Sequence, residues 1–114
     1  MKKMIKYILS LTILMMSATV SRAQNDTLVI QTNSVCNTCK KIIERDMMFE
    51  KGVKSASLNV ESKELTLIYQ EGKTDAGKLR IAVSKIGYDA DNIPADAKAR
   101  QRLPDCCKNP DAHH

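Results

Sequence analysis

Residues 27–53 read TLVIQTNSVCNTCKKIIERDMMFEKGV and change from a strand pattern to a helix pattern across a short polar loop. The first part, 27–32, is rich in β-branched residues and predicts a strand. Residues 33–37 predict a loop, and an amphipathic helix is expected to follow. Cys36 lies in the loop and Cys39 in the first helical turn. The sequence therefore places a Cys-x-x-Cys pair between a strand and a helix.

The helix after this loop is expected to bury one side. At 100° per residue, its apolar residues fall within one arc of about 160°, and the charged residues lie outside that arc. Gly52 is expected to end the helix in the left-handed conformation that glycine adopts readily. The apolar arc consists of Ile42, Ile43, Met47 and Phe49.

Beyond Gly52 the sequence predicts a hairpin and then a second amphipathic helix. Alternating apolar residues predict strands over 53–60 and 64–69, joined by a turn. Thr74 or Asp75 can cap the helix that follows. Its apolar stripe consists of Leu79, Ala82, Val83 and Ile86.

Gly87 is expected to close this second helix, and residues 88–93 predict a short final strand. The order is then strand, helix, strand, strand, helix, strand. This order predicts an α+β, ferredoxin-like βαββαβ fold with an antiparallel four-stranded sheet and two helices on one face. We expect one domain over residues 24–94.

Residues 1–23 are typical of a secretory signal peptide. Three lysines among the first six residues precede an apolar run over 7–20, and small residues precede a cleavage position after Ala23. The apolar run is shorter than the roughly 20 residues that a bilayer requires. We therefore expect an exported protein, periplasmic or extracellular in a bacterium, with no stable membrane insertion after cleavage.

The charge of the chain gives no indication of a nucleic-acid partner. The whole sequence has 18 basic and 13 acidic side chains, and four of the basic ones lie in the predicted signal peptide. The remainder is close to neutral and has no clustered basic face of the kind that nucleic-acid binding requires. Aromatic residues, which would stack on bases, make up only 4% of the chain.

Cys36 and Cys39 are the candidate metal ligands. The unpaired N–H groups and the dipole of a helix N-terminus favour thiolate over thiol. Soft sulfur ligands select Cu(I), Hg(II) or Zn(II) over hard cations. We expect the pair to be exposed to solvent, so that a partner's thiols can take the ion by ligand exchange. Lys40 and Lys41 follow the pair and are expected to form a solvated helix face; the alternative is that they offset the negative charge of a bis-thiolate complex.

This order of features resembles the heavy-metal-associated domain family, which includes copper chaperones, modules of copper-pumping ATPases and periplasmic mercury-binding proteins. The matching motifs are Cys36 with Cys39, Gly52-Val53 and Ile86-Gly87-Tyr88. The resemblance implies that the two cysteines bind one soft ion reversibly, with Cu(I) as the favoured ion. It also implies that Tyr88 packs beside the metal loop. It also implies transfer to a metal-transporting ATPase or another metal-binding domain. The chain departs from the family at residues 33–35, where Asn-Ser-Val replaces a frequent Gly-Met-Thr.

Residues 95–114 form a tail that contains a second pair, Cys106 and Cys107. The predicted last strand carries the chain about 20 Å away from the metal loop. A helix from Pro94 to Asp105 would cover about 18 Å in return. The two tail cysteines are therefore candidates for additional metal ligands that would close the site.

Other interpretations of the cysteines stay open. The same Cys36–Cys39 pair would serve a thiol–disulfide redox protein. All four cysteines could instead form disulfides in an exported interaction module, or exposed loops could share an ion in a metal-bridged dimer. His113 and His114 are expected to have no role. The sequence contains no catalytic set of residues, and we expect no enzyme activity.

Overall fold

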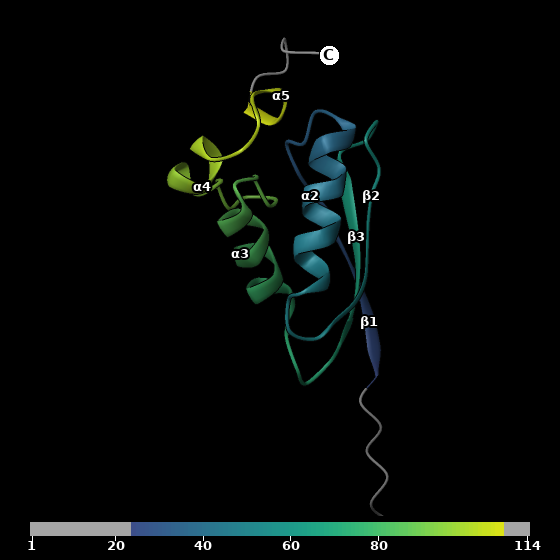
Figure 1. Ribbon diagram of the computed structural model, residues 1–114. Helices are drawn as coiled ribbons and strands as arrows, with labels where there is room; N and C mark the ends of the chain where they lie inside the picture. The colour runs from purple at the N-terminus through teal and green to yellow at the C-terminus, as the bar shows by residue number, and fades with distance from the viewer. Residues whose placement is uncertain (1–23, 109–114) are drawn as a thin grey trace, which may run out of the picture.

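The computed structural model describes residues 24–108 (Figure 1). The signal peptide predicted over 1–23 and the two histidines that end the chain lie outside these residues. Within 24–108, no helix is both long enough and apolar enough to cross a bilayer. The elements are β1 (Asn25–Gln31), α2 (Asn37–Met48), β2 (Val53–Leu58), β3 (Glu64–Gln70), α3 (Ala76–Ile86), α4 (Ala97–Gln101) and α5 (Asp105–Lys108).

The sheet is antiparallel, with β3 as the central strand in the order β1-β3-β2. Leu67, near the middle of β3, pairs with Leu28 on one side and Ala56 on the other. Alternate residues of β3, namely Leu65, Leu67 and Tyr69, are buried, as expected for a strand with one face on the core. The predicted hairpin of β2 and β3 is confirmed.

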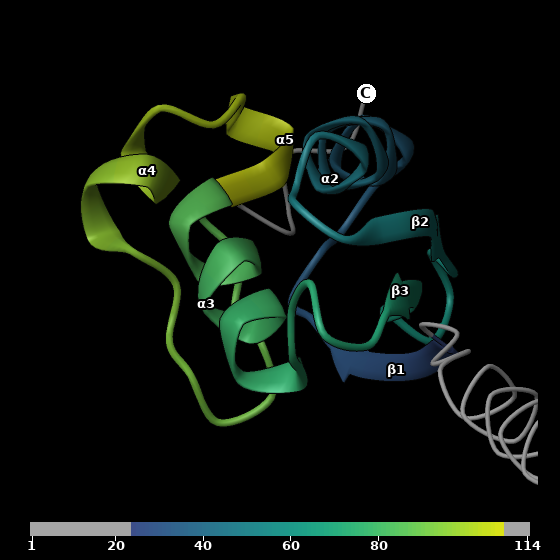
Figure 2. The same ribbon diagram turned by 90° about the horizontal axis from the view of Figure 1, so that it is seen from below.

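Helices α2 and α3 lie side by side on one face of the sheet (Figures 1 and 2). Leu79 and Val83 of α3 join the core, and their four-residue spacing places them on one helical face. Asp75 accepts a hydrogen bond from the backbone N–H of Lys78 at 2.9 Å, and Gly87 ends the helix at φ 117°. The α+β class, the two helices on one face and both predicted ends of α3 are thus confirmed.

The predicted fourth strand over residues 88–93 is wrong: the described residues contain a three-stranded sheet. Ala90 and Ile93 bridge to each other and close a tight turn, with Asp91 at φ 52°. Asp91 makes two hydrogen bonds with the backbone of Gln31 at the end of β1: the Asp91 N–H donates to the Gln31 carbonyl, and the Asp91 carboxylate accepts from the Gln31 N–H. A segment with two aspartates and an asparagine favours such side-chain contacts over a ladder.

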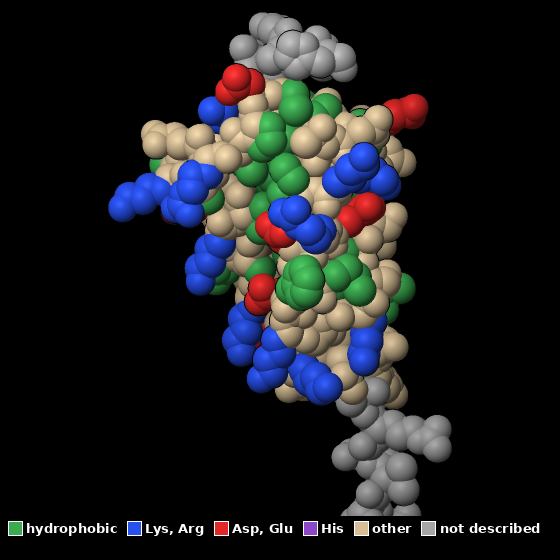
Figure 3. Space-filling view, in the orientation of Figure 1, with side chains coloured by type: hydrophobic (Ala, Val, Ile, Leu, Met, Phe, Trp, Pro, Cys, Tyr) green, Lys and Arg blue, Asp and Glu red, His purple; other side chains and the backbone are tan. Residues whose placement is uncertain are grey.

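The core face of α2 also differs from the predicted arc. The fully buried stripe is Cys39, Ile43 and Met47, at four-residue spacing. Phe49 is 85% exposed, because it lies about 120° around the helix from Ile43 and follows the last helical residue, Met48. Apolar side chains are visible at this end of α2 in Figure 3.

Gly52 has the expected positive φ of 85°, but it does not cap the helix. Helix α2 already ends at Met48, and Gly52 lies in the turn that leads into β2. There its carbonyl accepts a hydrogen bond from the backbone N–H of Gln70 at 2.8 Å. Gly52 therefore links the turn to the central strand, β3, through a backbone hydrogen bond.

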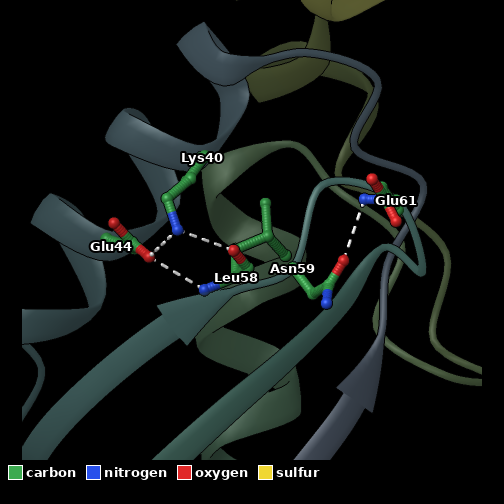
Figure 4. Close-up of polar contacts among 5 residues, drawn as sticks. All are labelled: Lys40, Glu44, Leu58, Asn59 and Glu61. Atoms are coloured by element: carbon green, nitrogen blue, oxygen red, sulfur yellow. Dashed lines mark hydrogen bonds and ion pairs between the residues drawn. The ribbon is translucent and has the colours of Figure 1, made fainter.

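Lys40 and Glu44 anchor α2 to the end of β2, as Figure 4 shows. The Lys40 ammonium lies 3.0 Å from the Glu44 carboxylate and donates to the Leu58 carbonyl at 2.8 Å. The same carboxylate accepts from the Leu58 N–H at 2.8 Å. Lys40 is therefore engaged by β2, and the expectation that it forms part of a solvated face is wrong.

After Leu58 the chain turns, so β2 ends two residues before the end of the strand predicted over 53–60. The side chain of Asn59 accepts hydrogen bonds from the backbone N–H groups of Glu61 and Ser62 (Figure 4 shows the first). An asparagine that bonds the backbone two residues ahead favours a turn over an extended strand.

Replacing Glu44 by alanine should lower the free energy of unfolding by about 1–2 kcal/mol, because it leaves the Leu58 N–H without its charged acceptor. Urea denaturation followed by circular dichroism would measure the change. Glu50→Ala is the matched control: Glu50 is exposed and its side chain has no polar contact in the described residues, so we expect a change within about 0.5 kcal/mol. Equal losses in the two variants would contradict the anchoring role.

Candidate metal centre

Cys36 and Cys39 come together because α2 begins between them. Cys36 is the N-cap residue, with extended backbone at φ −155° and ψ 173°, and Cys39 lies in the first turn. Their Sγ atoms are 3.4 Å apart. The four cysteines of the described residues are all free thiols. The structure therefore brings the predicted pair together at the helix N-terminus.

The loop before Cys36 is anchored by hydroxyl groups where the family often has a methionine. Ser34 is 1% exposed, and its hydroxyl lies 3.1 Å from that of Thr32. The Thr32 hydroxyl in turn donates to the Lys63 carbonyl at 2.8 Å. Asn33 accepts from the backbone N–H of Asp89 at 2.9 Å. A small polar network thus holds the loop against the end of the sheet.

The tail brings the second pair of cysteines to the same place. α4 and α5 fold back beside α3 and the start of α2 (Figures 1 and 2). The Sγ atom of Cys36 lies 3.4 Å from that of Cys106 and 3.9 Å from that of Cys107. The sulfurs of these three residues all lie within 4.8 Å of one another. Cys36 is therefore the common neighbour of the other three thiols, a role that its sequence position did not indicate.

The return of the tail follows a different path from the predicted single helix. Asp96 caps α4 by accepting from the Ala99 N–H at 3.0 Å, and the chain turns again before the short α5. Ala99 and Leu103 are 9% and 8% exposed, so the tail contributes to the core. The four-residue spacing of these two apolar residues is a signal in the sequence that could have indicated a buried face of the tail.

Gly87 allows the tail to pack closely. A Cβ atom at this position would lie 2.9 Å from the backbone nitrogen of Arg100 and 3.0 Å from the carbonyl carbon of Ala99. Any side chain would therefore collide with the backbone of α4, and φ 117° adds conformational strain for an L-residue. Gly87 both ends α3 and makes room for the tail.

The expectation of an open, solvent-exposed pair is wrong for one of its members. Cys39 is completely buried and Cys107 is 1% exposed, whereas Cys36 and Cys106 are half-buried. In Figure 3, apolar side chains reach the surface where α5 meets α2. The site therefore has one sealed side, Cys39 with Cys107, and one accessible edge, Cys36 with Cys106.

The surroundings of Cys36 favour its thiolate. Partial burial opposes ionisation, but the backbone N–H and the thiol of Cys39, the thiol of Cys106 and the backbone N–H of Thr38 all stabilise the charge. Together they lower the pKa of Cys36 from 9.0 to about 7. Burial, together with the Cys39 thiol, raises the pKa of Cys107 well above its ordinary value.

Cys36 should consequently be the thiol that reacts first in the reduced, metal-free protein. Its alkylation by iodoacetamide should reach half of its maximal rate near pH 7, since the rate follows the thiolate fraction as the pH rises through the pKa. Peptide mass spectrometry after timed quenching would give the rate for each cysteine. Labelling of Cys107 as fast as Cys36 at pH 7 would contradict this assignment.

Tyr88 forms the inner wall of the site. Its side chain is fully buried, and its hydroxyl has no hydrogen-bond partner of suitable geometry in the described residues. Burial and the neighbouring sulfurs of Cys107 and Cys39 raise the pKa of Tyr88, so the hydroxyl keeps its proton. An unpaired buried donor beside two sulfurs fits an arrangement in which those sulfurs become thiolates and accept from it.

The donor set fits a soft ion with more than two ligands. An ion bound tetrahedrally at about 2.3 Å from each sulfur separates the sulfurs by about 3.8 Å. The three separations from Cys36 are 3.4, 3.4 and 3.9 Å. Cys36, Cys106 and Cys107, whose sulfurs all lie within 4.8 Å of one another, can therefore approach one ion with only small shifts of their side chains, whereas Cys39 lies close to Cys36 but outside this mutually close set.

Comparison with known proteins gives consistent results. The pattern of the heavy-metal-associated domain matches residues 33–89, half of the chain. Copper-exporting P-type ATPases from Staphylococcus aureus strains JH9 and Newman are 34% identical over 59 residues, which is 52% of this chain. The chain spans only 7% of the length of these curated relatives.

Solved structures with the same fold include the CopZ metallochaperone, with a TM-score of 0.54 and 24% identity over 57% of this chain and 98% of that one. Oxidised MerP from Ralstonia metallidurans CH34 has a TM-score of 0.57 and 19% identity over 60% of this chain and 96% of that one. These likenesses support the ferredoxin-like architecture. Since the matched half contains both Cys36 and Cys39, the chain belongs to the heavy-metal-associated domain family.

Proposed function

We propose that this protein binds one soft metal ion, Cu(I) in preference to Hg(II) or Zn(II), through Cys36 and Cys39, with Cys106 and Cys107 completing the site. The observation that carries the proposal is the position of Cys36, whose sulfur lies 3.4–3.9 Å from each of the other three. Thiols that approach so closely without forming disulfides are suited to share an ion. Thiolate sulfur is the ligand type that soft metals prefer.

The names of the similar proteins support copper over the other soft metals. The curated relatives are copper-exporting ATPases, and CopZ is described as a metallochaperone. A further structure, 30% identical with a TM-score of 0.53, is described under crosstalk between Cu(I) and Zn(II) homeostasis. Zn(II) also accepts four sulfurs, so it is the natural competitor to test beside Cu(I).

The proposed role is to buffer the ion or to pass it on, without catalysis. Its partner would be a metal-transporting ATPase or another metal-binding domain, and the N-terminal sequence supports export to the periplasm or the cell exterior. A metal-bridged dimer could form only at the accessible edge, because Cys39 and Cys107 are buried. Gel filtration with and without the ion would reveal such a dimer.

Anaerobic titration of the reduced protein with Cu(I), in the presence of a competing chelator, tests this function directly. We expect tight uptake of one ion per chain, and weaker uptake of Zn(II). Elemental analysis of protein purified without air should find the same metal. Failure of the reduced protein to compete with the chelator for either ion would reject metal carriage as its function.

A thiol–disulfide function is the second candidate, because a lowered Cys36 pKa and a neighbouring thiol 3.4 Å away also suit disulfide exchange. The two functions predict different behaviour toward glutathione and toward metal ions. A redox protein would cycle between dithiol and disulfide with a glutathione buffer and would take up no metal. A carrier would bind the ion only when reduced.

A further inference from the structure

The tail segment, residues 95–108, docks on the domain through a specific interface. The Ala95 N–H donates to Asp89 at 2.8 Å, and the Asp96 N–H donates to the carbonyl of Ser84 at 2.9 Å. The Ser84 hydroxyl donates to the carbonyl of Pro94 at 2.7 Å. These bonds fix where the tail leaves α3.

Further along the tail segment, apolar packing replaces hydrogen bonds. Leu103 belongs to the buried core cluster, and Ala99 and Arg100 pass within contact distance of Gly87. The tail segment therefore folds back as a packed part of the domain, which places α5 at the start of α2. Its two cysteines lie outside residues 33–89, the part that matches the family.

The tail segment also supplies half of the sulfurs and closes one side of the site. Cys107 is buried with Cys39, and Cys106 shares the accessible edge with Cys36. An incoming ligand can therefore reach the ion at this edge, but it cannot reach the Cys39 side while α5 stays docked.

We propose that the tail segment is an internal ligand donor that must be displaced before a bound ion can leave, so that it slows loss of the ion to competing ligands; this inference rests on the proposed function. Displacement is a ligand exchange without change of oxidation state. Each bond from the ion to an incoming sulfur or nitrogen replaces one bond to a protein sulfur. The released thiolate takes up a proton from water.

Undocking the tail segment without removing any sulfur separates this role from simple ligand loss. Leu103→Ser keeps all four cysteines but replaces the apolar anchor of the tail. Arg102→Ser is the matched control, since Arg102 is the preceding residue and is exposed. Each full-length protein is reduced, loaded with one equivalent of Cu(I), and mixed in a stopped-flow instrument with excess bathocuproine disulfonate, whose Cu(I) complex is coloured.

We expect Leu103→Ser to release Cu(I) at least about tenfold faster than the wild type, equivalent to about 1.4 kcal/mol. Arg102→Ser should match the wild type. If Leu103→Ser is not folded by circular dichroism, the milder variant Leu103→Ala decides, because it shortens the same apolar anchor and keeps all four cysteines. Faster release from that variant supports the proposal.

Equal release rates in the wild type and the folded variants would overturn the internal-donor role while leaving metal binding intact. A wild type that takes up no Cu(I) would instead reject the proposed function itself. The loading step therefore distinguishes the two failures.

Discussion

Cys36→Ser is expected to lower the affinity for Cu(I) by at least about 100-fold, because loss even of outer-shell partners of a metal costs 10–100-fold. Among the described residues, Cys36 is the thiol whose sulfur contacts each of the other three, at 3.4, 3.4 and 3.9 Å. It is also the thiol with a pKa near 7, so it provides thiolate at neutral pH. Chelator competition under anaerobic conditions would measure the change.

Cys106→Ser is the graded comparison for this prediction. Cys106 is also half-buried, but its sulfur makes one hydrogen-bonding contact with another thiol, that of Cys36. We expect its replacement to weaken binding less than Cys36→Ser does, since Cys36 and its two other neighbouring sulfurs remain. Equal affinities of the two variants would show that Cys36 is not the centre of the site.

Ile43→Ala should cost about 2–5 kcal/mol of unfolding free energy, the range for truncating a buried aliphatic side chain to alanine. Ile43 is completely buried between Cys39 and Met47 on the core face of α2. Its loss leaves a cavity between the helix and the sheet, directly below the turn that carries Cys39. Chemical denaturation of the reduced protein would measure the loss.

Ile42→Ala is the matched control for this core prediction. Ile42 has the same side chain and adjoins Ile43, but it is only half-buried because it lies about 100° around the helix. We expect a loss of about 1 kcal/mol. Equal losses at the two positions would mean that the buried stripe of α2 has been assigned to the wrong side.

The sequence was a good guide wherever neighbouring residues determine structure. Alternation in β3, the Asp75 cap and the glycine that ends α3 all follow from contacts within a few residues, and all are found. The class of the fold and the proximity of Cys36 to Cys39 follow for the same reason. The helix N-terminus brings a Cys-x-x-Cys pair together without help from the rest of the chain.

The predictions from the sequence fail where the structure depends on contacts between residues that are far apart in the chain. Residues 88–93 had a weak strand pattern, and the side chain of Asp91 took the place of a ladder with β1. At residues 33–35 the chain departs from the frequent Gly-Met-Thr of the family, and the hydroxyl of Thr32 and the carbonyl of Lys63 anchor the loop through Ser34 instead. Asp91 is 60 residues from Gln31 and Lys63 is 31 residues from Thr32, so no local pattern shows these contacts.

The sequence by itself determined which residues can bind a soft metal and where two of them meet, since sulfur chemistry and helix geometry are local properties. Only the tertiary structure decided that Cys106 lies 3.4 Å from Cys36, 70 residues earlier in the chain. It also decided that Cys39 is buried. The first result depends on the close packing of the tail on Gly87 and on the burial of Leu103, and the second on the core face that Cys39 shares with Ile43 and Met47. Contacts between segments so far apart are set by the shape of the folded core, which residue spacing does not encode.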